Sequence, residues 1–185
     1  MVRNSRLLEK EHTGLIIIDM QTKLLKAMLH KDEMMENCKK LMAGCKILKV
    51  PIFLTEQNPK GLGKTSAALK KVMGEIEPWE KTSYSCVGIE GFVHQLRAQK
   101  LDQLILTGIE SHVCIWQSAL DLLNTGFQVT VAQDCISSRK QADFDIALKG
   151  MQQEGIALKS TEMILFELLK TCNDEGFKKI LALIK

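Results

Sequence analysis

The stretch that decides the fold is Leu101–Arg139, with the sequence LDQLILTGIESHVCIWQSALDLLNTGFQVTVAQDCISSR. Leu104–Leu106 is an apolar run of strand length, and Thr107–Gly108 is expected to end that strand before a polar turn. Apolar residues then recur at helical spacing from Cys114 to a helix stop at residues 124–126, and residues 127–131 alternate as a second strand. This order predicts two parallel strands joined by a right-handed crossover.

Cys114 falls where the expected turn becomes a helix. Open α/β sheets bind their ligands at this kind of position, outside the carboxyl end of a strand. A helix N-terminus there would also lower the pKa of the Cys114 thiol and favour the nucleophilic thiolate. Cys114 is therefore a candidate nucleophile, although a single cysteine is more often a small residue of the core.

The rest of the chain repeats the alternation of strand and helix. Further strands are expected at residues 15–18, 50–54, 79–83 and 156–158, and further helices at residues 32–49, 67–73, 89–100, 140–154, 161–169 and 174–184. Leu15–Ile18 is four apolar residues in succession, which predicts a central strand buried on both faces. Thr161 is expected to cap the helix that it begins. The pattern predicts an α/β protein with three αβα layers, a doubly wound, Rossmann-like sheet of six parallel strands.

Composition fits one soluble domain. The chain has 185 residues, 45% hydrophobic and 25% charged, with a net charge of +3. No apolar run is long enough to span a membrane and no signal-peptide core is present, so we expect a cytoplasmic protein that does not bind membranes. Lysines scattered among acids give no support to nucleic-acid binding. Six cysteines without CxxC or zinc-finger spacing argue against a disulfide framework, and Cys86 and Cys135 are expected to be structural.

Two nucleotide-binding patterns fail. The polar segment Thr55–Thr65 ends in Gly63-Lys64-Thr65, which imitates a phosphate loop, but its glycines are too close together for GxxxxGK[ST]. We interpret the segment as a surface loop that borders a pocket. A nucleotide-binding oxidoreductase would suit the fold, but no GxGxxG follows the first strand.

Three residues could carry chemistry together: Asp19, Lys81 and Cys114. Each lies at or just past the carboxyl end of an expected strand, and neighbouring strand ends converge on one crevice in a doubly wound sheet. A cysteine nucleophile needs a base to take its proton and a positive charge to hold the anion, which Asp19 and Lys81 could supply. Taken singly, Asp19 could be a turn cap and Lys81 a solvated surface residue.

Four motifs in order carry a family resemblance: LIIIDMQ at residues 15–21, TEQNPKGLG at 55–63, EKTSYSC at 80–86 and TGIESHVC at 107–114. With them the chain resembles the isochorismatase-like hydrolases, which are cysteine hydrolases, and most closely the isochorismatase domain-containing proteins. The resemblance covers nearly the whole length. It implies a single isochorismatase-like hydrolase domain over residues 1–185 and a homo-oligomer.

The resemblance also implies roles for individual residues. Asp19 would be the general base, Cys114 the attacking thiolate, and Lys81 the residue that stabilises the charged forms and orients Asp19. A cis peptide bond would join Ile109 and Glu110. The backbone N–H groups of Glu110 and Cys114 would then form an oxyanion hole.

Two departures from the family pattern limit the substrate. Nicotinamidases of this superfamily place metal-binding histidines after the second strand, but Thr55–Gly61 contains none, so neither a metal nor another cofactor is expected. Leu24 replaces an aromatic residue that many relatives carry. The candidate lining of the substrate pocket is Gln21, Leu24, Gln57, Tyr84 and His112. For His112 a simple turn role is an open alternative.

These features favour a metal-independent cysteine hydrolase that acts on a small amide- or ester-like molecule. The natural substrate does not follow from the motifs. The alternative is a non-catalytic, homo-oligomeric binding or scaffolding protein that retains the pocket. Reactivity of the Cys114 thiol separates the two hypotheses, because only a hydrolase needs an activated nucleophile.

Overall fold

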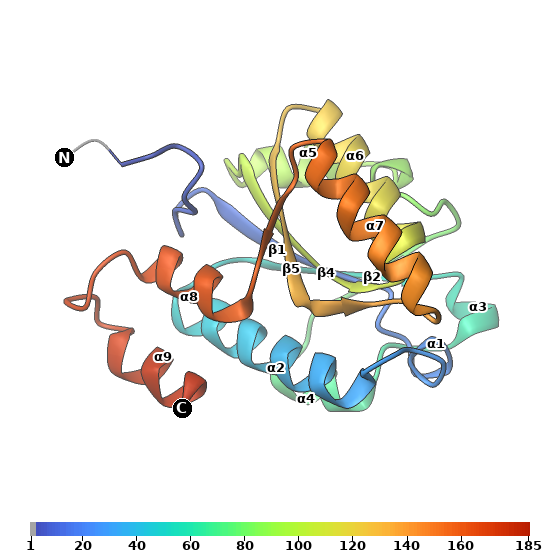
Figure 1. The fold of residues 1–185 in the computed structure, drawn as a ribbon, viewed down its shortest axis with the longest axis horizontal. Helices are drawn as coiled ribbons and strands as arrows, with labels where there is room; N and C mark the ends of the chain where they lie inside the picture. The colour runs from blue at the N-terminus through green and yellow to red at the C-terminus, as the bar shows by residue number, and fades with distance from the viewer. Residues whose placement is uncertain (1–2) are drawn as a thin grey trace.

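Six parallel strands form the sheet that organises residues 3–185, the part of the chain that this computed structural model describes (Figure 1). Their order is β3-β2-β1-β4-β5-β6. The bounds are β1 Thr13–Ile18, β2 Ile52–Gln57, β3 Trp79–Lys81, β4 Gln103–Ile109, β5 Gln128–Ser137 and β6 Ala157–Lys159. The strand order reverses between β1 and β4, so the predicted doubly wound sheet is confirmed. The first two residues of the expected domain lie outside the described residues.

Helices cover both faces of the sheet (Figure 1). They are α1 Thr22–Leu25, α2 Lys31–Ile47, α3 Pro59–Leu62, α4 Ala67–Met73, α5 Phe92–Ala98, α6 Trp116–Asn124, α7 Gln141–Gln153, α8 Thr161–Leu169 and α9 Phe177–Ile184. One core lies between the sheet and α2, α4, α8 and α9, and the other lies between the sheet and α5, α6 and α7. In the described part of the chain, no helix is both long and apolar enough to cross a bilayer.

The central strand β1 supplies side chains to both cores. All six of its residues are buried. Leu15 and Ile17 pack into the core under α2, and Ile16 and Ile18 pack into the core under α6. This alternation is the reason for the unbroken apolar run in the sequence, because a parallel strand that is covered on both faces needs apolar side chains at successive positions.

The end of β4 differs from expectation. The strand continues through Thr107 and Gly108 to Ile109 instead of ending at Leu106. Gly108 has φ +119°, and a Cβ there would lie 2.0 Å from the carbonyl oxygen of Ile18. Gly108 is thus not a strand breaker. It allows the backbones of β1 and β4 to approach closely just before the residues that follow both strands.

The end of β2 also corrects an expectation. Thr55, Glu56 and Gln57 belong to the strand, and Thr55 and Glu56 are fully buried instead of lying in a surface loop. Thr55 pairs with Ile18 of β1, and Gln57 pairs with Lys81 of β3. Neighbours on both sides satisfy the backbone of β2, so its polar end can remain inside the sheet.

The cap of α8 is a third correction. Ser160, not Thr161, is the N-cap, and its hydroxyl accepts a hydrogen bond from the Met163 N–H at 3.3 Å. The Thr161 hydroxyl instead donates to Asp134 Oδ1 at 3.0 Å, and the Thr161 N–H donates to the same carboxylate. Thr161 therefore joins α8 to β5.

Candidate functional site

Asp19 and Lys81 form an ion pair at the carboxyl edge of the sheet. Asp19 directly follows β1 and Lys81 is the last residue of β3. Lys81 Nζ lies 2.7 Å from Asp19 Oδ2, and both side chains are 0% exposed. Two of the three candidate residues, 62 positions apart in sequence, are thus brought into direct contact, as the convergence of strand ends predicts.

Asp19 is held by β2 as well as by Lys81. Its φ is +56°, a left-handed conformation that aspartate tolerates better than most residues. The Asp19 N–H donates to Thr55 O at 3.2 Å, and Thr55 Oγ1 donates to Asp19 Oδ1 at 2.8 Å. One carboxylate oxygen therefore accepts a hydrogen bond from a hydroxyl, and the other forms an ion pair with an ammonium. Sequence reasoning missed Thr55, although its place beside Ile18 follows once the strands are aligned.

The Lys81 ammonium has three hydrogen-bond acceptors around it, one for each of its protons. It donates hydrogen bonds to Gln57 Oε1 at 2.6 Å, Tyr84 O at 3.0 Å and Ser83 O at 3.2 Å, and it forms an ion pair with Asp19. These acceptors replace the water that the buried group has lost. Lys81 is accordingly fixed in position and is not the solvated surface residue that it would be in isolation.

Cys114 lies on the turn that follows β4, and its thiol responds to both charges. Its pKa is raised to about 12, first because burial disfavours the thiolate and then because Asp19 is negative; the Lys81 ammonium opposes the shift. The expectation that a helix end would lower this pKa is wrong. The helical turn begins at Ser111, upstream of Cys114, and desolvation of the 7% exposed residue has the larger effect. The resting thiol is protonated and needs a base.

The peptide bond between Ile109 and Glu110 is cis. The Glu110 carboxylate turns to Arg139, whose backbone N–H and Nε donate to Glu110 Oε2 at 3.2 and 3.0 Å. Among residues 3–185, no backbone carbonyl accepts a hydrogen bond from the Glu110 N–H. That donor is free for another acceptor.

Gln21 and Gln57, both expected in the pocket lining, are bonded to each other and to the backbone. The Gln21 side chain accepts from Gln57 N at 2.9 Å and donates to Gln57 O at 3.0 Å and Gly63 O at 2.6 Å. The Gln57 amide donates to Thr82 O at 2.9 Å while its oxygen accepts from Lys81. The polar atoms of both side chains are thus occupied by hydrogen bonds within the protein, and the Gln57 oxygen contacts Lys81 directly.

The other three expected pocket residues differ in exposure. Leu24 is partly buried against the core under α2, and Tyr84 is 55% exposed next to the Lys81 network. His112 Nδ1 lies 2.9 Å from Ser138 Oγ, and His112 Nε2 lies 3.8 Å from Asp143 Oδ2. Only Tyr84 presents a large exposed surface, and His112 joins the Cys114 turn to the chain after β5.

Cys86 is a second buried thiol near the ion pair. It is 0% exposed, and burial is the main cause that raises its pKa to about 11, with further effects of Asp19 and Lys81. Its N–H donates to Ser118 Oγ at 3.0 Å. Cys135 is also fully buried, with its sulfur 3.1 Å from Thr161 Oγ1. A structural role for both remains our prediction.

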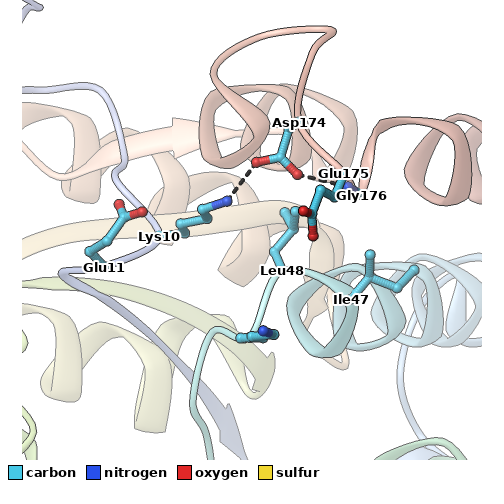
Figure 2. A pocket seen from close by; sticks show the side chains of 8 residues that line it. Lys10, Glu11, Ile47, Leu48, Asp174, Glu175 and Gly176 are labelled. Atoms are coloured by element: carbon cyan, nitrogen blue, oxygen red, sulfur yellow. Dashed lines mark hydrogen bonds and ion pairs between the residues drawn. The ribbon is translucent and has the colours of Figure 1, made fainter.

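Two surface hollows lie at opposite edges of the sheet. One, of about 430 Å³, borders Lys81 and is lined by part of the segment 55–65 together with residues 88–90. The other, in Figure 2, lies before β1 and beside the end of α2, where Lys10 Nζ contacts Asp174 Oδ2 at 2.5 Å. Parallel strands have their amino ends there, so the Figure 2 hollow is remote from Asp19 and Cys114. Within residues 3–185, no cluster of three or more His, Cys, Asp or Glu side chains could hold a metal ion.

Sequence comparison matches residues 13–163 to the isochorismatase domain. Isochorismatase family protein 1B from Dictyostelium discoideum is 37% identical over 189 residues, which cover 100% of this chain and 92% of that protein. Isochorismatase domain-containing protein 2 from Danio rerio is 36% identical over 171 residues, which cover 92% of this chain and 85% of that protein.

Solved structures share the fold. A structure described as the MAR1 ribonuclease from Caenorhabditis elegans has a TM-score of 0.91 and 34% identity, covering 96% of this chain and 92% of that one. YcaC from Pseudomonas aeruginosa, solved with hexane-2,5-diol and covalent acrylamide, has a TM-score of 0.89 and 25% identity, covering 98% of this chain and 93% of that one.

Proposed function

Because the chain belongs to the isochorismatase family and has the isochorismatase-like hydrolase fold, we propose that it is a metal-independent cysteine hydrolase of a small amide- or ester-like substrate. Asp19, Lys81 and Cys114 are the proposed catalytic residues. The observation that carries the proposal is the buried 2.7 Å pair of Asp19 and Lys81, whose charges both act on the Cys114 thiol.

The first step is attack by Cys114 on the substrate carbonyl carbon. Because the thiol is protonated at neutral pH, its proton passes to Asp19 as the sulfur–carbon bond forms, and the carbonyl electron pair moves to oxygen. The Glu110 and Cys114 N–H groups stabilise that oxyanion. Lys81 stays an ammonium and stabilises the negative charge that is passed between carboxylate and sulfur.

The second step releases the products. The carbon–leaving-group bond breaks as the oxyanion collapses, and the proton on Asp19 passes to the leaving amine or alcohol. Asp19, again a carboxylate, then takes a proton from water, whose oxygen attacks the thioester carbon. Expulsion of the sulfur, which recovers the proton from Asp19, frees the acid and restores the thiol.

The proposed substrate contacts are Leu24, Tyr84 and His112. Leu24 and Tyr84 would present an apolar and an aromatic surface to a small amide- or ester-like molecule, and His112 a ring nitrogen. Assembly into a homo-oligomer belongs to the same proposal, and light scattering of the purified protein measures it.

The covalent acrylamide of the Pseudomonas aeruginosa relative supports an electrophile-reactive group in this fold. Acrylamide alkylates thiols, so the same reagent is a probe for Cys114 that requires no knowledge of the natural substrate. Cys172 is exposed and serves as the internal reference for an ordinary thiol in the same molecule.

The test combines acrylamide labelling, read by peptide mass spectrometry, with a panel of small amides and esters. We expect Cys114 to be alkylated faster than Cys172, and we expect Asp19→Asn and Lys81→Met to remove that advantage. We expect hydrolysis of at least one panel compound by the wild type and none by Cys114→Ala. An RNA oligonucleotide is included because the Caenorhabditis elegans relative is described as a ribonuclease, and we expect no cleavage.

The alternative function has its own signature in the same experiment. If Cys114 labels no faster than the buried Cys45 and no compound is hydrolysed, the site lacks an activated nucleophile. The protein would then be a binding or scaffolding protein that retains the fold.

A further inference from the structure

We infer that Gln57 is a positioning residue: it fixes the direction of the Lys81 ammonium and thereby leaves an Asp19 lone pair free to accept the Cys114 proton. This inference rests on the proposed function, in which Asp19 is the general base. It removes Gln57 from the substrate contacts and gives it a role through Lys81.

The first step of the argument is the allocation of the ammonium protons. An ammonium has three N–H donors, and Lys81 has Asp19 Oδ2 at 2.7 Å, Gln57 Oε1 at 2.6 Å and two carbonyl oxygens at 3.0 and 3.2 Å around it. The contact with Gln57 is the shortest of the four. Gln57 and the two carbonyl groups accept the three hydrogen bonds, so among residues 3–185 Asp19 Oδ2 is held by the charge of the ammonium and accepts no hydrogen bond.

The second step concerns the lone pairs of Asp19. A carboxylate offers about four acceptor positions, and here Thr55 Oγ1 occupies one on Oδ1, while within residues 3–185 those on Oδ2 accept no hydrogen bond and only face the ammonium charge. Without Gln57, the ammonium would have a free proton in a buried site and would turn it toward the remaining negative charge. An Asp19 that accepted this hydrogen bond from Lys81 would be a weaker base toward Cys114, since a donated hydrogen bond stabilises the charged carboxylate.

The third step is that Gln57 can present only its oxygen to Lys81. Its amide nitrogen donates to Thr82 O at 2.9 Å, and the reverse orientation would place an NH₂ group against the ammonium. Its backbone is fixed as well, because the fully buried Gln21 side chain bonds both Gln57 N and Gln57 O. The acceptor is therefore preorganised before any substrate binds.

The experiment is a kinetic double-mutant cycle on acrylamide labelling of Cys114 at pH 7.5. Gln57→Met keeps the approximate shape of the side chain and removes its acceptor. We expect Gln57→Met to slow labelling about tenfold in the wild-type background, in keeping with a lost hydrogen bond to a charged group. In the Lys81→Met background, we expect Gln57→Met to change the rate less than about twofold, since it acts through Lys81.

The control is Gln152→Met, an exposed glutamine on α7, which should leave the rate unchanged. A tenfold effect of Gln57→Met in both backgrounds, or no effect in either, would overturn the inference and leave Gln57 with a purely structural role. If circular dichroism shows that Gln57→Met does not fold, Gln57→Asn replaces it in the same cycle. The asparagine side chain is one methylene group shorter, so its oxygen lies farther from Lys81. If wild-type Cys114 shows no dependence on Asp19 or Lys81, the proposed function fails instead.

Discussion

Replacing Lys81 by methionine is expected to destabilise the protein strongly, because it leaves the Asp19 carboxylate as an unpaired buried charge. Both side chains are 0% exposed and 2.7 Å apart. Removing one partner of a buried pair costs about 3–5 kcal/mol. For a domain of this size each kcal/mol shifts the melting temperature by about 2–4 °C, so we expect a decrease of roughly 6–20 °C.

The double variant Asp19→Asn with Lys81→Met tests the cause of that loss. It removes both charges, so its cost should be smaller than the sum of the two single variants by about 2 kcal/mol or more. Urea unfolding at pH 7, monitored by circular dichroism, gives the free energy of unfolding of the wild type, the two single variants and the double variant. The double variant should remain inactive, because it regains stability but lacks both the Asp19 base and the Lys81 charge.

A surface ion pair provides the matched control. Lys39 Nζ lies 2.6 Å from Glu36 Oε1, a similar distance, but the two side chains are 30% and 64% exposed. Lys39→Met should cost at most about 0.5 kcal/mol. A cost of Lys81→Met as small as that of Lys39→Met, or additive free energies in the cycle, would refute the claim that a desolvated ion pair organises the site.

Three further outcomes are expected. The acrylamide labelling rate of wild-type Cys114 should not change from about pH 6 to 9, because Asp19 takes the proton during attack. In Asp19→Asn the rate should rise about tenfold per pH unit, because the thiol, with its pKa raised well above neutral, must ionise first. A tenfold rise per pH unit in the wild type would contradict the role of Asp19. Gly108→Ala should destabilise the protein by several kcal/mol, about as much as an overpacked core, since the new Cβ would meet a backbone oxygen at 2.0 Å; an unchanged melting temperature would show that β1 and β4 can separate. Hydrogen bonds from Lys10 and then from the Gly176 N–H lower the pKa of Asp174, and the hydrogen bond to Asp174 raises the pKa of Lys10. The Asp174 shift adds stability above the ordinary carboxyl pKa of 3.8, and this stability is lost as pH falls through the lowered pKa. The Lys10 shift adds stability below the ordinary lysine pKa of 10.5, and this stability is lost as pH rises through the raised pKa. Lys10→Met should therefore cost less than about 1 kcal/mol in urea unfolding at neutral pH and progressively less below pH 4, and a cost that stays constant from pH 3 to 9 would argue against the pair.

Several features of the fold follow from local sequence alone. The apolar run Leu15–Ile18 predicted a central strand covered on both faces, and β1 lies between β2 and β4 with every residue buried. The alternation of strands and helices predicted the parallel sheet, and the order of the four motifs indicated the family that the isochorismatase domain match then showed. These features can be predicted because the periodicity of apolar residues indicates which face of a strand or helix packs against a core.

The residues at which the strands end were harder to predict from the sequence. Thr55 and Gln57 were expected in a surface loop because they are polar, but both belong to β2. Thr107–Gly108 was expected to end a strand that continues to Ile109. Polarity predicts exposure only when no partner is near, and here the partners come from strands that are distant in sequence.

The sequence by itself determined which residue types stand at the strand ends, and so it named Asp19, Lys81 and Cys114 as candidates. Only the tertiary structure decided that two of them form a desolvated ion pair and that the pKa of the third is raised instead of lowered. The physical reason is that a pKa depends on burial and on charges from every neighbouring element. For Cys114 these are burial first, then the charges of Asp19 and Lys81, which come from strands distant in sequence.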